Sequence, residues 1–160
     1  MTTIQVHLNI NDRPYTLSTS ASRTLLDVLR EDLGLTGVKD ACGGEGECGA
    51  CTVIMDGAPV NSCLVLIGQA DGCQIETIEG LSKDGQPHRI QKAFVEMGAV
   101  QCGYCTPGAI IASKALLEQS PHPSDDEIRE ALAGNLCRCT GYSKMLAAVH
   151  LAAEVRNHGD

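Results

Sequence analysis

Nine cysteines in 160 residues constrain this chain more than any other feature, because eight of them fall into two spaced groups. Cys73 lies outside both groups, and we expect it to be a small buried hydrophobe. The number is odd, and the segment Met1–Val6 has no basic region or long apolar stretch, which predicts a cytoplasmic protein with reduced thiols. Metal or cluster ligation is therefore favoured over a disulfide scaffold. The eight grouped residues are Cys42, Cys48, Cys51, Cys63, Cys102, Cys105, Cys137 and Cys139.

Charge and composition exclude several classes of protein. The formal net charge is −8, so binding to nucleic acid, which needs clustered Lys and Arg, is not expected. No run of 18 apolar residues is present, so no membrane span is expected. Hydrophobic residues make up 43% of the chain but aromatic residues only 2%, which predicts cores built from Leu, Ile, Val and Ala. Two small cores of this kind would need further stabilisation, and the cysteines are the candidates to supply it.

The first half has the pattern of a small mixed sheet crossed by one helix. Alternating apolar residues and turn signals predict strands at 4–10, 15–18, 52–55, 60–63 and 74–78. Thr24 and Asp27 have the spacing of a helix cap, and Gly34 fits a helix end, which predicts a helix over 25–33. A glycine-rich loop over 34–51 then carries three of the cysteines.

The second half is helical in pattern, with helices predicted over 87–97, 106–118, 124–133 and 142–155. Asp125, Asp126 and Glu127 follow Ser124 as a helix start and are not expected to form a catalytic pair. Four short helices indicate a compact bundle. The polar stretch 79–86 separates the halves, so we expect one domain over 1–79 and a second over 80–160.

The first cysteine group indicates an iron–sulfur site. Plant-type ferredoxins hold a [2Fe–2S] cluster with C-x4-C-x2-C and a distant fourth cysteine. Here the first gap holds five residues, and the fourth ligand is expected on a following strand. Glycines let the backbone wrap closely around a cluster whose sulfurs accept N–H bonds. A structural zinc site with four thiolates is the alternative, but zinc sites usually show two close cysteine pairs.

The second group consists of C-x2-C at 102–105 and C-x-C at 137–139, each before a predicted helix. Two helix N-termini would favour thiolates and the negative cluster they hold. From spacing alone, zinc remains an alternative here as well. A thioredoxin-like pair is disfavoured, because no parallel βαβ pattern surrounds the motif and four cysteines are available.

Three segments together resemble a known family: CGGEGECGACT at 42–52, QCGYCTPG at 101–108 and GNLCRCTGY at 134–142. They are similar to the iron–sulfur subunits of the molybdenum hydroxylases, the superfamily of xanthine dehydrogenase, aldehyde oxidoreductase and carbon monoxide dehydrogenase. The similarity spans about residues 3–155. It implies an α+β fold in which a plant-ferredoxin-like β-grasp domain precedes a four-helix bundle, each carrying one [2Fe–2S] cluster.

The resemblance also implies a role in a larger enzyme. A large subunit would bind molybdopterin and hydroxylate the substrate with oxygen from water, and a medium subunit would carry FAD. This chain would relay single electrons from molybdenum through the helical-domain cluster and then the β-grasp cluster, with no catalytic site of its own. Gln101 and Cys139 are the residues expected to contact molybdopterin. Arg138 would either raise the potential of its cluster or form a surface ion pair.

Two other functions stay open at this stage. One is a free-standing two-cluster ferredoxin acting as a carrier, and the other is a zinc-stapled adaptor without redox function. The substrate is selected in the large subunit, and we expect an N-heteroaromatic compound or a purine. A higher oligomer of the heteromeric enzyme is also expected from the family.

Overall fold

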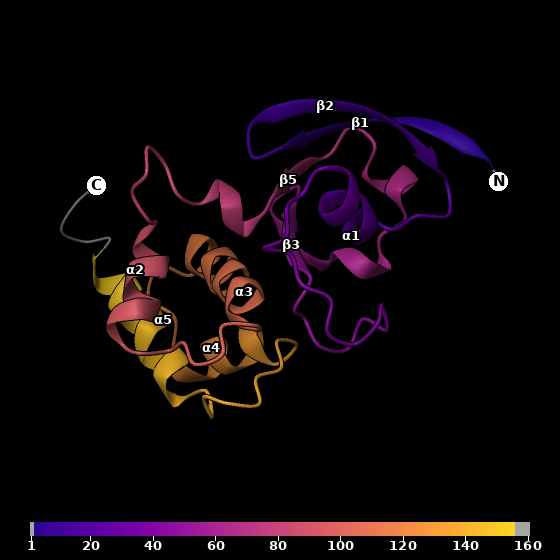
Figure 1. Cartoon of the computed structure of the whole chain (residues 1–160). Helices are drawn as coiled ribbons and strands as arrows, with labels where there is room; N and C mark the ends of the chain where they lie inside the picture. Colours follow the sequence, from indigo (N-terminus) through magenta and orange to yellow (C-terminus); the bar gives the residue numbers. More distant parts are fainter. Residues whose placement is uncertain (1, 156–160) are drawn as a thin grey trace.

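A five-stranded mixed sheet forms the first half of the computed structural model, which describes residues 2–155 (Figure 1). Its strands follow the order β2-β1-β5-β3-β4, so the last strand in sequence lies in the middle of the sheet. β1 pairs antiparallel with β2 and parallel with β5, and β3 is antiparallel to both β4 and β5. The strands are β1 Thr3–Ile10, β2 Arg13–Ser20, β3 Thr52–Met55, β4 Ala58–Asn61 and β5 Gln74–Glu76.

One short helix crosses this sheet, as predicted, but its second part is wider than an α-helix. α1 (Leu25–Asp27) continues directly into a π-helical segment, Val28–Asp32. The Thr24 hydroxyl accepts the amide hydrogen of Asp27, and the Asp27 carboxylate accepts that of Thr24, which confirms the predicted cap. Gly34, at φ +68°, follows the helical segment and allows the chain to turn away.

The end of β4 differs from the prediction. The strand ends at Asn61, and Cys63 lies in a 3₁₀ turn, Ser62–Leu64, not in a strand. β4 starts earlier than expected and contains Pro59, which is tolerated because β4 is an edge strand with one partner. The turn brings Cys63 back toward the sheet, where the Ser62 hydroxyl donates to the Cys51 carbonyl at 2.8 Å.

Four helices make up the second half and gather on one side of the sheet (Figure 1). Their observed bounds lie within two residues of the predicted ones. Pro107 occupies the first turn of α3, where a proline needs no intrahelical partner. The helices are α2 Arg89–Glu96, α3 Thr106–Gln119, α4 Asp125–Leu132 and α5 Ser143–Val155. The α+β fold class predicted from the sequence is therefore confirmed.

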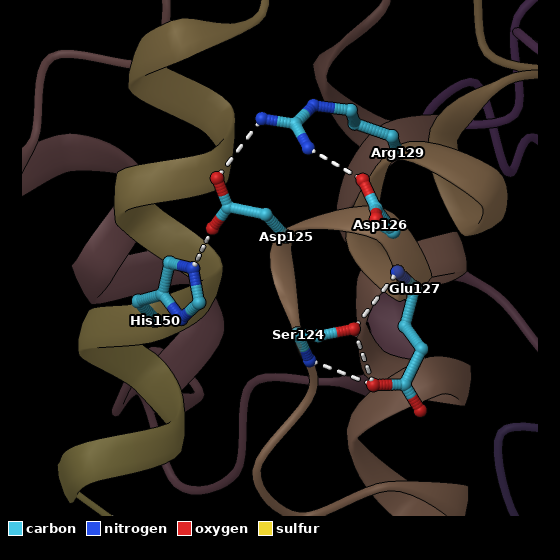
Figure 2. A network of polar contacts seen from close by, with 6 residues as sticks. All are labelled: Ser124, Asp125, Asp126, Glu127, Arg129 and His150. Carbon is cyan, nitrogen blue, oxygen red and sulfur yellow. Dashed lines mark hydrogen bonds and ion pairs between the residues drawn. The ribbon is translucent and has the colours of Figure 1, made fainter.

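The start of α4 is built from surface polar contacts (Figure 2). The Ser124 hydroxyl accepts the amide hydrogen of Glu127, and the Glu127 carboxylate accepts the Ser124 amide hydrogen at 2.7 Å. Asp125 binds Arg129 on its own helix and His150 on α5. These acidic residues thus cap and stabilise the start of a helix, as the sequence predicted.

Each half has its own aliphatic core. In the first half, β1 contributes Val6, Leu8 and Ile10, which pack with Leu25 and Leu29 from the helical segment. The second core surrounds Phe94, the one aromatic side chain among the fully buried residues of the described chain. Leu, Ile, Val and Ala supply most of both cores, in agreement with the composition.

The two halves meet where α3 packs on β3 and β4. Ile54 of β3 belongs to the core of the helical half and not to that of the sheet. Lys114 of α3 reaches across to Glu76 of β5 at 2.8 Å and also binds Glu118 at 2.6 Å. None of the helices between residues 2 and 155 is both long and apolar enough to cross a membrane.

Candidate metal centres

The first cysteine set lies in the loop between the π-helical segment and β3, together with the turn after β4. Cys51 and Cys63 are buried, while Cys42 and Cys48 are partly exposed. The thiols interact in two pairs, Cys42 with Cys48 and Cys51 with Cys63. The structure thus brings the four predicted residues of this set together as two adjoining pairs.

The thiol pKa values in this set diverge because their surroundings differ. The backbone N–H of Glu47 and the neighbouring Cys48 lower the pKa of Cys42 to about 7. Burial and the adjoining Cys51 raise the pKa of Cys63 to about 12. Backbone N–H groups directed at a sulfur stabilise a thiolate, which is the form that binds metal.

The loop wraps this set because its backbone takes conformations that favour glycine. Gly46 has φ +75°, and a Cβ there would lie 2.4 Å from Cδ1 of Leu64. The Asn61 amide donates to the Gly46 carbonyl at 2.8 Å and fixes the loop to the end of β4. At Gly46 the loop therefore has a backbone conformation and a close contact that favour glycine.

The second set joins two loops of the helical half. Cys105 is the N-cap residue of α3, with Cys102 just before it, and Cys137 and Cys139 lie between α4 and α5. The second pair lies further from its helix than the first, because α5 begins at Ser143, four residues after Cys139 and one residue later than predicted. The interval from Cys139 to that helix is a turn in which Gly141 has φ +64°.

The contacts within this second set cross between the two motifs. The Sγ atoms of Cys102 and Cys139 lie 3.7 Å apart, and the thiols of Cys105 and Cys137 also interact. Burial and the adjoining Cys137 raise the pKa of Cys105 to about 12. Burial acts the same way on Cys137, but hydrogen bonds from Thr140, the Cys139 backbone and the Cys105 thiol together outweigh it and lower its pKa to about 7.

The two pairs of the helical half differ in exposure. Cys102 and Cys139 are exposed, whereas Cys105 and Cys137 are partly covered. Gln101 and Arg138 are exposed beside them, and Arg138 makes no ion pair within residues 2–155. This site therefore opens to the surface along Cys102 and Cys139, while Cys105 and Cys137 face the protein.

Both donor sets fit a two-iron cluster better than one metal ion. A [2Fe–2S] cluster held by four cysteines takes two thiolates on each iron, and both sets present two close pairs. A structural zinc ion needs four ligands converging on one point.

The remaining cysteine lies away from both sets. Cys73 precedes β5 and is half-buried, not fully buried as expected, with its Sγ 3.7 Å from the Gln69 carbonyl. It packs against the core of the sheet half. The structure gives it no part in either site.

Sequence reasoning missed several residues that hold the sites. The Thr140 hydroxyl donates to the Cys137 sulfur at 3.1 Å, and the Tyr142 hydroxyl accepts the Cys137 amide hydrogen at 2.8 Å. The repeated threonine after each cysteine pair was a signal that could have indicated the first role. Contacts between the halves, such as the bond from the Tyr104 hydroxyl to the Asp40 carbonyl, leave no such signal in the sequence.

Comparison with known proteins agrees with this geometry. Residues 8–77 match the 2Fe-2S iron-sulfur cluster binding domain, and residues 77–150 match the [2Fe-2S] binding domain. The nicotinate dehydrogenase small FeS subunit of Eubacterium barkeri is 55% identical over 154 residues, which cover 96% of this chain and 98% of that protein. The chain belongs to the iron–sulfur subunits of the molybdenum hydroxylases.

Solved structures of this family share the whole fold. Quinoline 2-oxidoreductase from Pseudomonas putida 86 superposes with a TM-score of 0.93 at 43% identity, over 98% of both chains. The aldehyde oxidoreductase of Desulfovibrio gigas gives a TM-score of 0.91 at 44% identity, covering 96% of this chain but 17% of that one. Small subunits of the family are thus matched along nearly their full length, while in the aldehyde oxidoreductase the same fold is one part of a much longer chain.

With one match in each half, this member of the family binds two [2Fe–2S] clusters. The zinc-stapled adaptor considered from the sequence is therefore not supported.

Proposed function

We propose that this chain is the electron-transfer subunit of a molybdenum-dependent oxidoreductase and relays single electrons from a molybdopterin centre on a large subunit to FAD or another acceptor. The observation that carries the proposal is the arrangement of eight thiols as two sets, each made of two close pairs. A [2Fe–2S] cluster changes by one electron, so two of them suit a relay and not a hydride transfer.

Each half of the chain is proposed to supply one ligand set. The domains would span 1–79 and 80–160, and the change from one core to the other near this boundary supports the division. The protein's own part is to hold thiolates, direct N–H groups at them and limit the access of water to the more covered pair of each set, Cys51 with Cys63 and Cys105 with Cys137. The proposed ligands are Cys42, Cys48, Cys51 and Cys63 in the first half and Cys102, Cys105, Cys137 and Cys139 in the second.

The exposed side of the helical site is proposed to face the large subunit. Gln101, Cys102 and Cys139 are exposed together there, as a contact with a partner's cofactor requires. We therefore assign Gln101 and Cys139 to contact with molybdopterin. In this orientation the helical site receives electrons first and passes them to the β-grasp site and then to the acceptor.

The wider assembly is proposed from the family. We infer a large molybdopterin-binding subunit, a medium subunit with FAD, a higher oligomer of the heteromer and a cytoplasmic location. Relatives named for nicotinate and quinoline support an N-heteroaromatic substrate.

Purification from the native source tests the proposal. The chain should co-purify with a larger subunit that contains molybdenum, and adding the substrate should bleach the visible iron–sulfur absorbance. A chain that runs as a lone monomer without a molybdenum-bearing partner would instead support a free-standing carrier. Mass spectrometry of the co-purified subunits also decides whether a flavin subunit is present.

A further inference from the structure

A buried asparagine connects the two metal-binding loops. Asn135 follows α4 and is only 5% exposed. Its side-chain amide donates to the Gly49 carbonyl at 2.9 Å and to the Thr52 hydroxyl at 3.1 Å, and that hydroxyl donates to the same carbonyl at 2.6 Å. The asparagine belongs to the helical half, and both of its partners belong to the β-grasp half. Such a buried amide is costly to leave unpaired, so the bonds fix where the loops meet.

Glycines bring the backbones at this contact unusually close. A Cβ on Gly49 would lie 2.3 Å from the carbonyl oxygen of Gly134, and a Cβ on Gly108 would lie 2.3 Å from the carbonyl oxygen of Gly49. Real Cβ atoms do not approach backbone oxygen this closely. The loop of the first cysteine set is therefore clamped between the start of α3 and the loop that leaves α4.

One backbone hydrogen bond then links the two cysteine sets. The Leu136 amide donates to the Cys48 carbonyl at 2.9 Å, and Leu136 directly precedes Cys137. The Asn135 carbonyl meanwhile accepts the Tyr142 hydroxyl at 3.2 Å, the same hydroxyl that accepts the Cys137 amide hydrogen. Asn135 is thus bound to the β-grasp loop by its side chain and to the helical loop by its backbone.

We propose that Asn135 is a positioning residue that sets the separation and electronic coupling of the two metal centres, by holding the Leu136 amide on the Cys48 carbonyl. The inference rests on the proposed ligand sets and deepens the proposed relay. The rate of electron tunnelling falls exponentially with the distance between two centres. The magnetic dipolar interaction of two unpaired spins falls with the inverse cube of that distance. A small displacement at this contact therefore changes both quantities, even when each centre remains intact.

The test uses the intact enzyme with both clusters reduced. Asn135→Asp keeps the size of the side chain but places a carboxylate against the Gly49 carbonyl. We expect both reduced-cluster EPR signals to remain, while the splitting from their mutual magnetic interaction decreases and electron transfer between them slows. Thr52→Val should act in the same direction, and Thr52→Ser, which keeps the hydroxyl, should retain the wild-type splitting.

A matched control separates positioning from general loosening of the loop. Asn61 also donates its amide to a loop carbonyl, that of Gly46, but within one half. Asn61→Asp should therefore leave the splitting between the centres unchanged.

Two results would overturn the proposal: wild-type splitting and transfer rate in Asn135→Asp, or an equal loss of splitting in Asn61→Asp. If Asn135→Asp fails to load its clusters, the Thr52→Val and Thr52→Ser pair decides, because equal behaviour of those two variants contradicts the proposal. Absence of the two signals from the wild type would instead refute the ligand sets.

Discussion

Cys102 and Cys139 bring their sulfur atoms within 3.7 Å of each other although 37 positions separate them in the chain. Cys105 and Cys137 form a second pair between the same two loops, on the less exposed side of the site. The helical-domain centre is therefore formed jointly by the loop before α3 and the loop before α5. Because four thiols must converge from two loops, we expect metal binding to be coupled to folding of this half.

Replacing one ligand in each set tests their independence. Cys105→Ser should abolish or alter the EPR signal of the helical-domain cluster and leave that of the β-grasp cluster, and Cys48→Ser should do the reverse. The reason is that a serine hydroxyl is a poor substitute for a thiolate on iron. Turnover with the physiological acceptor should fall in both variants. A variant that keeps both signals and full turnover would refute the assignment of its cysteine.

Gly108→Ala should destabilise the protein although alanine is the better helix former. The added Cβ would lie 2.3 Å from the Gly49 carbonyl, and overpacking of this kind costs about 1–3 kcal/mol. The apparent Tm should fall by roughly 2–4 °C for each kcal/mol lost. Gly134→Ala is the matched control, since its Cβ would meet nothing within 4 Å. Equal Tm values for the two variants would contradict the close packing of the loops.

Thr140→Val should lower the reduction potential of the helical-domain cluster. The Thr140 hydroxyl donates to the Cys137 sulfur at 3.1 Å, and such bonds stabilise the more negative reduced cluster. Thr140→Ser keeps the donor and should retain the wild-type potential. A redox titration followed by EPR measures both values. An unchanged potential in Thr140→Val would show that this hydrogen bond does not tune the cluster.

His88 makes stability depend on pH. Its Nδ1 accepts the amide hydrogen of Ile90 at 3.3 Å at the start of α2, so the cap needs the neutral ring. Burial, assisted by the positive charges of Arg89 and Lys114, lowers the pKa of His88 below its ordinary value of 6.5. Below pH 6.5 the unfolded chain therefore binds more protons than the folded one, and stability falls as the pH drops toward the folded pKa.

His88→Asn is the variant that isolates this effect, because asparagine caps helices without ionising. The apparent Tm of the wild type should fall more steeply below pH 6.5 than that of His88→Asn, and the two should run parallel above it. Parallel curves at all pH values would exclude His88 as the titrating group.

Local signals in the sequence predicted most of the fold. The Thr24–Asp27 cap, the Ser124–Glu127 cap and Pro107 each act within one turn, and the helices start where these residues indicate. One departure is Cys63, which was expected on a strand but lies in a 3₁₀ turn. β4 ends at Asn61, and the next residue, Ser62, bonds to the Cys51 carbonyl eleven positions away, a contact that the local pattern does not encode.

The sequence could predict which cysteines belong to each candidate site, but not which thiols lie next to each other within it. Spacing places Cys102 beside Cys105, whereas the fold pairs each of them with a residue beyond α4. The contacts of Asn135 could not be predicted from the sequence either, because its partners Gly49 and Thr52 belong to the other half of the chain. Contacts of this kind depend on how the halves pack, and no local propensity encodes that packing.

The central claim is that this chain binds two [2Fe–2S] clusters. Measuring iron, sulfide and unpaired electron spins in the native complex tests it most directly. Two [2Fe–2S] clusters per chain require about four iron and four sulfide ions, and dithionite reduction should produce two distinct EPR signals, each near one spin per chain. Colourless protein with zinc in place of iron, or a single signal with half the iron, would contradict the account.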